Sequence, residues 1–392
     1  MYDRILGLQR NVFFLGITSF FNDFSVEMVQ SVMPAFFISV LRSGTAALGV
    51  VEGLADAAAN VIKIFSGRLS DKLERRKIFA VAGYTLAVAT RPFYMLVDSV
   101  LGVIGIRLVD RVGKGLRDAP RDALISLSSA PEEIGWSFGY HRAMDTAGAI
   151  LGPLAAYCIL LYFPGSFNTV FALAFFVGLL AIASLSLVKD VKQLVHTNGL
   201  SPLTSFPATF QLYVTSVFVL SIGTIPVAIL LFKTQSSGFA LATIPLFYML
   251  YNVAFALFSW PSGQASDRFG SGRVIFLGYT FLILAYAVFH ASSTGLVLCA
   301  GFIALGIFSA FTDGVQRSHL AHLVSPENRG VAYGFLNAAQ GFGGLIAGIA
   351  GGYVWQYFGD SYALYSGVFV VMTGLLLFLW SLCFAPKGNH AI

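Results

Sequence analysis

Long apolar stretches alternate with short polar connections along almost the whole of this 392-residue chain. A helix of about 20 apolar residues crosses the hydrocarbon core of a bilayer. Six such stretches cover residues 12–38, 46–66, 78–97, 100–125, 136–162 and 167–188. Six more cover residues 208–232, 239–262, 274–292, 295–323, 331–357 and 361–384. The pattern predicts an all-α integral membrane protein with twelve transmembrane helices.

The two sets of six stretches repeat each other. Gly67-Arg-Leu-Ser-Asp71 follows the second stretch of the first set, and Gly263-Gln-Ala-Ser-Asp267 follows the second stretch of the other. A repeat with the same topology in each half predicts two six-helix bundles related by a pseudo-two-fold axis along the membrane normal. The longest polar connection divides them, which predicts an N-terminal bundle at 1–188, a cytoplasmic linker at 189–207 and a C-terminal bundle at 208–392.

Composition agrees with a membrane protein. Hydrophobic residues make up 57% of the chain and charged residues only 11%, whereas a soluble domain carries about 25% charged residues. The net charge of +5 is small, so we expect no nucleic-acid partner. The three cysteines lie in apolar stretches without metal-ligand spacing, and we expect no metal site and no cofactor.

The distribution of basic residues predicts the orientation. If the N-terminus lies inside the cell, thirteen Lys and Arg residues fall in cytoplasmic segments and two, Arg42 and Lys233, fall in outer loops. Cytoplasmic loops of membrane proteins carry this excess. We therefore predict a multi-pass protein of the cell inner (plasma) membrane with both termini in the cytoplasm.

One predicted membrane stretch carries an unusual charged face. At about 100° per residue, Arg107, Arg111, Lys114, Asp118 and Arg121 fall on one side of a helix. Charges are costly in hydrocarbon, so this side must face a water-filled cavity or other charges. The second half instead offers neutral hydrogen-bonding residues suited to an organic solute. The predicted cavity-lining residues are Arg107, Asp110, Arg111, Lys114, Arg142, Asn252 and Gln340.

Titratable residues also pair at a spacing of four within the membrane stretches: Asp23 and Glu27, Glu52 and Asp56, and His141 and Asp145. Two carboxylates one helical turn apart resist ionising together, so one of them tends to hold a proton. The predicted proton carriers are Asp23, Glu27, Asp56 and Asp145. The alternative is that these acids form structural ion pairs, although burying paired ions seldom gains stability over apolar packing.

The motifs resemble those of the major facilitator superfamily over the whole chain. The segment from Gly67 to Lys77 is similar to the signature loop of that family, which implies a gating role for Gly67, Asp71, Arg75, Arg76, Gly263 and Asp267. The segment Gly148-Ala-Ile-Leu-Gly152-Pro153 resembles a helix-5 motif of the family's antiporters. The resemblance implies the two-bundle fold of the family and transport by alternating access.

Other classes of membrane protein fit less well. The sequence lacks the motif HExxH and has no Walker loop, so we do not expect an enzyme. The repeat and the charges within the membrane disfavour a receptor. We predict a proton-coupled antiporter that exports a small organic solute. The alternative is a proton-coupled importer of an anionic solute such as a metal chelate or siderophore. The expected partners are the lipid bilayer, the solute and protons, and we expect a monomer.

Overall fold

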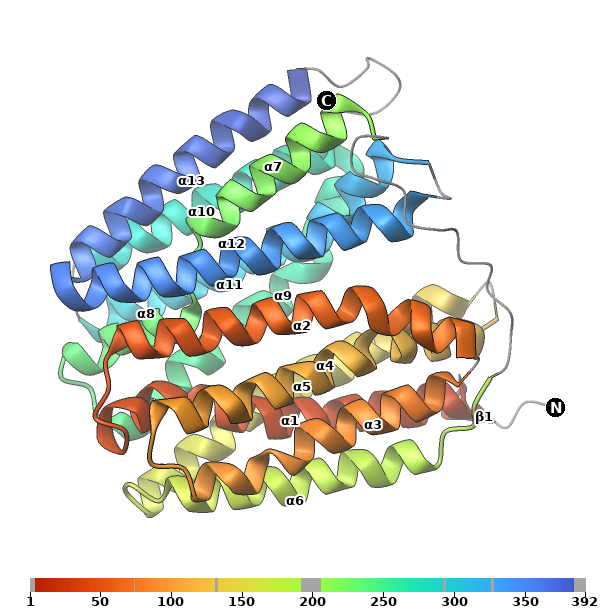
Figure 1. Ribbon diagram of the computed structural model, residues 1–392, viewed down its shortest axis with the longest axis horizontal. Coiled ribbons are helices and arrows are strands. Elements are labelled where there is room, and N and C mark those ends of the chain that lie inside the picture. The colour runs from red at the N-terminus through yellow and green to blue at the C-terminus, as the bar shows by residue number, and fades with distance from the viewer. Residues whose placement is uncertain are drawn as a thin grey trace. The chain divides into compact units, whose positions relative to one another are not determined.

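The computed structural model describes residues 4–73, 75–130, 133–191, 206–291, 294–325 and 328–383, with the backbone alone at 64, 67, 68, 71 and 72. Two short strands, β1 (Arg4–Ile5) and β2 (Leu8–Gln9), form an antiparallel hairpin just before the first helix. The rest of the described chain is helical apart from short connections (Figure 1).

The first half contains six membrane-spanning segments. They are α1 (Arg10–Ser39), α2 (Thr45–Leu73), α3 (Arg76–Ala89) continued by the 3₁₀ turn η1 (Arg91–Met95), α4 (Val100–Leu127), α5 (Ile134–Tyr162) and α6 (Phe167–Ser186). Each coincides with one predicted apolar stretch. Ser99 is the N-cap of α4: its side-chain oxygen accepts a hydrogen bond from the amide of Gly102.

The second half also contains six segments. They are α7 (Ala208–Ile222) followed by α8 (Val227–Ser236), the turn η4 (Leu241–Thr243) followed by α9 (Ile244–Phe269), α10 (Ser271–Ala291), α11 (Gly295–Leu323), α12 (Arg329–Phe358) and α13 (Asp360–Cys383). Nine helical segments in the described part of the chain are long and apolar enough to cross a membrane. The other three spans are α3 with η1, α4 with its charged face, and α12. The predicted all-α membrane fold with twelve spans is confirmed.

The predicted stretch 208–232 is not one continuous helix. The helix is interrupted between Ile222, the last residue of α7, and Val227, the first residue of α8. Pro226 lies in this break and has no amide hydrogen with which to continue the helical hydrogen bonds. Backbone groups freed inside a membrane need partners, because no water is available there. The hydroxyl of Tyr286 supplies both: it donates to the carbonyl of Gly223 at 3.0 Å and accepts from the amide of Ile225 at 2.7 Å.

The described chain forms two compact units. Unit 1 comprises Met1–Arg42, Leu54–Thr197 and Ala240–Met249, and unit 2 comprises Ser43–Gly53, Asn198–Phe239 and Leu250–Ile392. The start of α2 therefore packs with the second half, where Thr45 donates a hydrogen bond to the carbonyl of Gly352 at 3.0 Å. The predicted linker, 189–207, lies mostly outside the described residues.

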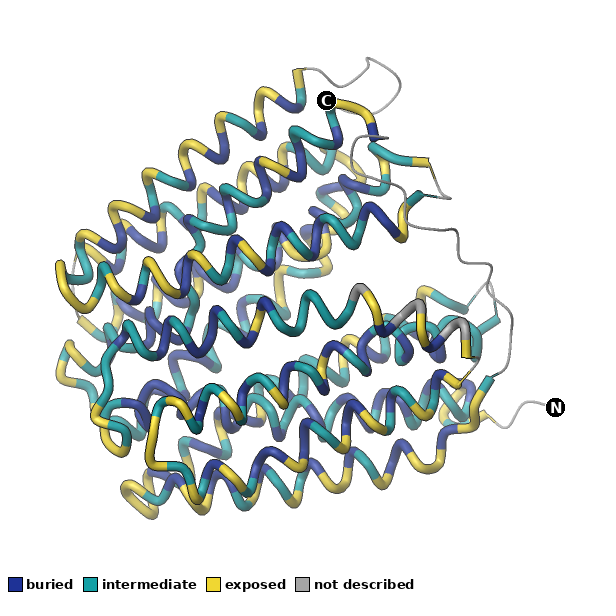
Figure 2. Tube along the Cα trace, viewed as in Figure 1, coloured by how far each residue is buried: buried dark blue, intermediate teal, exposed yellow. Residues whose placement is uncertain are grey.

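Most helices bury one side and expose the other, whereas α1 is buried or half-buried along nearly its whole length (Figure 2). Leu15, Tyr84, Leu124 and Leu185 belong to a fully buried core cluster of unit 1. Large apolar side chains are exposed at helical spacing instead of charges, as on α13 at Phe369, Leu376 and Trp380. An apolar exposed side is what contact with lipid requires.

Candidate proton-coupling and solute-binding site

Helix α4 lies close to α2 and α3 because glycines face them. A Cβ built on Gly113 would lie 2.7 Å from the carbonyl oxygen of Gly83 in α3. One built on Gly115 would lie 2.7 Å from Cβ of Ile62 in α2. These approaches bring the charged side chains of α4 within reach of polar groups on neighbouring helices of unit 1.

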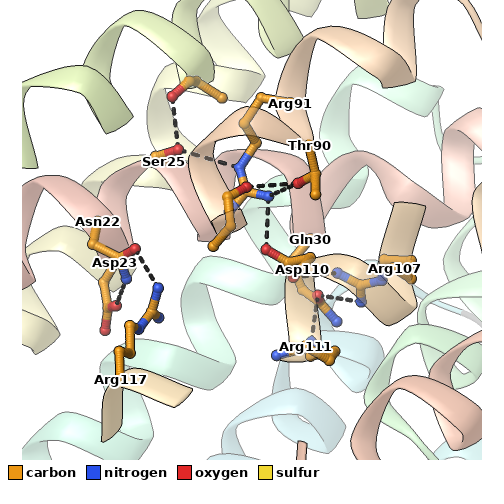
Figure 3. Close-up of polar contacts among 12 residues, drawn as sticks. Asn22, Asp23, Ser25, Gln30, Thr90, Arg91, Arg107, Asp110, Arg111 and Arg117 are labelled. Atoms are coloured by element: carbon orange, nitrogen blue, oxygen red, sulfur yellow. Dashed lines mark hydrogen bonds and ion pairs between the residues drawn. The ribbon is translucent and has the colours of Figure 1, made fainter. Parts of the chain in front are cut away.

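Asp110 forms a buried ion pair rather than an isolated charge. Its Oδ1 accepts from Nη1 of Arg91 at 2.8 Å, and both side chains are at most 4% exposed (Figure 3). Nη1 of Arg91 also donates to the hydroxyl of Thr90, and Nε of Arg91 donates to that of Ser25. The pair links the end of α3 to α4 and to α1. Its contacts fit a structural role.

Arg107 and Arg111 converge on one acceptor. Nη2 of Arg107 donates to the side-chain oxygen of Gln30 at 2.6 Å, and Nη2 of Arg111 donates to the same oxygen at 3.2 Å (Figure 3). Both arginines are buried. Arg111 also lies 3.7 Å from the carboxylate of Asp56, whose side chain is 56% exposed. Two guanidinium groups thus meet a neutral amide that comes from α1.

Two further charges of α4, Arg117 and Asp118, have other partners. Arg117 donates to the side-chain oxygen of Asn22 at 2.7 Å and lies 4.5 Å over the ring of Tyr84. Lys63 of α2 binds the carboxylate of Asp118 at 3.1 Å. Lys114 is exposed. The charged face of α4 therefore joins α1, α2 and α3 at several levels.

The acids of α1 lie directly against the glycines of the helix-5 motif. A Cβ built on Gly148 would lie 2.4 Å from the carbonyl oxygen of Phe20 and 3.2 Å from Cβ of Asp23. One turn along, a Cβ built on Gly152 would lie 3.1 Å from Cβ of Glu27. The two pairs share a spacing of four residues, so each acid faces one glycine. The helix-5 motif thus brings the backbone of α5 against both acids.

This register gives a prediction for Gly148. The substitution Gly148→Ala should force α1 and α5 apart and destabilise the protein by about 1–3 kcal/mol, as overpacking usually does. The matched control is Gly139→Ala on the same helix, where the added Cβ meets nothing within 4 Å. Ala is the better helix former, so the control should be neutral or stabilising. Equilibrium unfolding in detergent measures both, and equal effects would contradict the close approach.

These acids differ from the acids of α4 in their partners. Within the described residues, no Lys or Arg forms an ion pair with Asp23 or Glu27, in contrast to Asp110 and Asp118. Asp23 accepts a hydrogen bond from Asn22. Oε2 of Glu27 is buried and has no hydrogen-bond partner in the described part of the chain, and the Glu27 side chain has a hydrogen bond with Tyr248.

Asp145 lies on α5 near the same interface. Ser19 of α1 donates a hydrogen bond to its Oδ1, and Nδ1 of His141 lies 3.6 Å from its Oδ2. Three of the four predicted proton carriers, Asp23, Glu27 and Asp145, thus lie on the two adjacent helices α1 and α5. The fourth, Asp56, instead lies beside Arg111.

Two predicted solute ligands belong to unit 2 and are uncharged. Asn252 of α9 is buried. Gln340 of α12 donates to the side-chain oxygen of Gln316 at 2.8 Å, and Gln316 donates to the hydroxyl of Tyr279 at 3.0 Å. Arg142, the remaining candidate in this group, is exposed on α5.

Basic residues of the predicted gating loop meet the end of α6. Arg76 is fully buried and donates to the carbonyl of Val191 at 3.3 Å. Nζ of Lys77 donates to the carbonyl of Ser186 at 2.9 Å. Positive charge at a helix C-terminus is favourable, since the carbonyls there lack helical partners. Arg75 is exposed.

The other gating residues are placed only in part. Gly263 and Asp267 are exposed on α9. The side chains at positions 67 and 71, and so the expected contacts of Gly67 and Asp71, lie outside the described residues. Pro153 of the helix-5 motif is buried within α5.

Sequence reasoning left Gln30 and Ser19 out of the candidate residues. Gln30 shares a helical face with Asp23 and Glu27, and that periodicity was a usable signal. Ser19 lies four residues before Asp23 on α1, but its partner Asp145 is 126 residues away. Only the packing of α1 on α5 identifies that contact.

Comparison with known proteins identifies the family. The sequence profile described as Major Facilitator Superfamily matches residues 15–216 and again residues 211–391. The uncharacterized MFS-type transporter MJ1317 of Methanocaldococcus jannaschii is 32% identical over 382 residues, which cover 94% of each chain. Multidrug resistance protein MdtH of Cronobacter sakazakii is 29% identical over 133 residues, 32% of this chain and 31% of its own.

The fold has solved counterparts. The crystal structure of the nucleoside transporter NupG superposes with a TM-score of 0.75 at 16% identity, covering 96% of this chain and 99% of that one. The double match of the family profile also agrees with the repeat seen in the motifs. The chain therefore belongs to the Major Facilitator Superfamily, and it is a secondary transporter of a solute rather than an enzyme.

Proposed function

We propose that this transporter exchanges protons for a small organic solute and exports the solute. The observation that carries the proposal is the set of acids on α1 and α5 that lack a Lys or Arg partner among the described residues. Asp23 and Glu27 face the helix-5 glycines, and Glu27 has a hydrogen bond with the neutral Tyr248 but no ion pair. These acids are the proposed proton carriers, with Asp145 beside them.

The physical argument concerns the cost of charge. An ionised carboxylate that is buried without an ion-pair partner is expensive, whereas the protonated acid is not. Such a group takes up a proton when it is enclosed and releases it when water or a cation reaches it. Asp110 lies beside Arg91 at 2.8 Å and is therefore a poor carrier.

Two observations support export. The helix-5 motif that faces the acids resembles that of antiporters in the family. The partial relative MdtH is named a multidrug resistance protein, although the likeness covers only 32% of this chain. No nucleotide-binding motif is present in the sequence, which leaves an ion gradient as the simplest source of energy.

Proton-coupled import of an anionic solute is the second candidate. It is favoured by Arg107 and Arg111, whose guanidinium groups converge on the oxygen of Gln30. If Glu27 is protonated, it does not compete with an anion for nearby arginines. A proton and an anion would then bind together, which is the requirement for symport.

The sign of a pH change separates the two functions. Purified protein is reconstituted into liposomes that contain a pH-sensitive dye, and organic amines, carboxylates and phosphates are added outside in turn. Under antiport, solute entry drives protons out and the lumen becomes alkaline. Under symport, solute entry carries protons in and the lumen becomes acidic. Solute uptake with no pH change would contradict proton coupling altogether.

We further propose that the protein functions as a monomer in the cell inner membrane with both termini in the cytoplasm. One chain supplies both copies of the repeat, and the basic residues are concentrated in the predicted cytoplasmic segments. Twelve crossings then place both ends of the chain on the same side.

Cysteine labelling in intact cells tests this orientation. In a variant without Cys158, Cys299 and Cys383, an impermeant maleimide should label Ser43→Cys and Ser237→Cys from outside. Asn198→Cys, in the predicted linker and outside the described residues, should react only after the cells are opened. Labelling of Asn198→Cys in intact cells would show that the proposed orientation is wrong.

A further inference from the structure

Gln30 occupies the point at which two arginine side chains meet. Its side-chain oxygen accepts from Nη2 of Arg107 at 2.6 Å and from Nη2 of Arg111 at 3.2 Å. Gln30 comes from α1 and the arginines come from successive turns of α4 (Figure 3). The arginines are 1% and 6% exposed, so the convergence is a buried feature and not a surface contact.

Carboxylates lie near both arginines on their other sides. Asp110, which is bound to Arg91 at 2.8 Å, lies 4.0 Å from Nη1 of Arg107. Nε of Arg111 lies 3.7 Å from the carboxylate of Asp56. Both contacts are ion pairs too long to be hydrogen bonds, so they attract each guanidinium group without fixing its plane. The two Nη2 groups nevertheless point at one position, the oxygen of Gln30.

The amide oxygen of Gln30 is a weaker hydrogen-bond acceptor than a carboxylate or phosphate oxygen would be in the same position. An amide oxygen is neutral and is a single atom. A carboxylate or a phosphate carries charge and offers two or three oxygens in the geometry that guanidinium groups match, and such hydrogen bonds are about twice as strong as neutral ones. A glutamine side chain has three rotatable bonds, so we expect its amide to swing aside and an oxyanion to take its place.

We infer that Arg107 and Arg111 form an oxyanion-binding site that Gln30 fills when no solute is bound. The ligand is a small organic molecule with a carboxylate or phosphate group, and that group takes the place of the Gln30 oxygen. The inference rests on the proposed function only in treating this ligand as the transported solute. Binding itself requires no proton gradient, so it can be tested apart from coupling.

The first test measures equilibrium binding to the purified full-length protein. The probes are benzoate, phenyl phosphate and the neutral benzamide, followed by thermal shift and isothermal calorimetry. At least one anion should raise the melting temperature and bind, and benzamide should bind at least about tenfold more weakly, corresponding to about 1.4 kcal/mol. No stabilisation by either anion, or equal binding of benzamide, would overturn the inference. The two anions distinguish a carboxylate site from a phosphate site.

The second test places the anion in the chain itself. In Gln30→Glu the new carboxylate reaches both arginines, so added anions should bind at least about tenfold more weakly, while the unliganded protein should melt no lower than the parent. Gln30→Ala removes the internal acceptor and keeps both arginines, so anion binding should be equal or tighter. Arg317→Gln on α11 is the control and should bind as the parent does.

The outcomes separate this site from the proposed coupling. If Gln30→Glu binds anions as the parent does, or melts well below it, the arginines do not form an oxyanion site. That result leaves proton movement by the α1 and α5 acids untouched. Conversely, anion binding without any solute-evoked pH change would leave the site standing and overturn the coupling.

Discussion

Glu27→Gln will abolish solute-evoked proton movement and leave solute exchange in place. Glutamine keeps the size and polarity of the side chain but holds no transferable proton. Glu27 lies against Gly152, and its Oε2 has no hydrogen-bond partner among the described residues. A proton carrier in that setting alternates between its protonated and its ionised form. Its replacement should reduce the pH signal in proteoliposomes to the level of protein-free liposomes.

Two measurements on the same preparation make the result specific. Exchange of labelled for unlabelled solute across the membrane should continue in Glu27→Gln, because solute binding does not need the proton. Asp98→Asn is the matched control, since Asp98 is an exposed acid outside the helices, and it should keep the full pH signal. Asp23→Asn should behave as Glu27→Gln does if the two acids share the proton.

A full signal in both Glu27→Gln and Asp23→Asn would identify the two acids as structural. The carrier would then be Asp145, which has Ser19 and His141 as neighbours, or Asp56 beside Arg111. The same assay on Asp145→Asn and Asp56→Asn decides between them. Loss of all transport together with loss of protein would point to folding instead of coupling.

The second large effect is expected at the buried pair of Arg91 and Asp110. Asp110→Asn leaves the Arg91 charge at most 4% exposed and without its carboxylate. Breaking a buried ion pair by removing one partner costs about 3–5 kcal/mol. Asp122→Asn is the control on the same helix, because the Asp122 side chain is 46% exposed in its pair with Arg121. It should cost no more than about 1 kcal/mol.

Equilibrium unfolding in mixed micelles measures this difference. The double variant Arg91→Met with Asp110→Leu replaces both charges with apolar groups, and such replacements are often neutral or stabilising. It should recover most of the stability that the single variant loses. If Asp110→Asn is as stable as the control but fails to bind the anionic probes, Asp110 belongs to the solute site and not to the framework.

The sequence was sufficient to predict the helices but not to predict which helix faces pack against each other. Apolar stretches and their polar ends predicted twelve spans, because a bilayer demands about 20 apolar residues in each. The spacing of Asp23 and Glu27 predicted that they share one face, and the spacing of Gly148 and Gly152 predicted a close approach. That the two faces meet in register depends on how α1 packs on α5, which spacing within one helix does not determine.

Charge pairing shows the same limit. Asp110 is predicted to line a cavity because it is a charge in an apolar stretch, and that stays a prediction. Its partner Arg91 lies 19 residues away near the end of another helix, and the sequence did not identify this pair. The break at Pro226 was visible in the sequence, but the apolar run continues through it. Hydropathy records the cost of side chains in lipid and does not record which backbone carbonyls have partners.

The hydroxyl that bridges α7 and α8 also limits which residues position 286 can tolerate. Tyr286 is buried in an apolar helix, where the usual substitution tables rank Phe as its nearest equivalent. Phe would fill the same volume and strand both the Gly223 carbonyl and the Ile225 amide, and each stranded backbone group in a membrane costs several kcal/mol. Residue choice at this buried aromatic position is therefore governed by a single oxygen atom and not by shape, so a Phe found there in a relative would indicate that its α7 is not broken in this way.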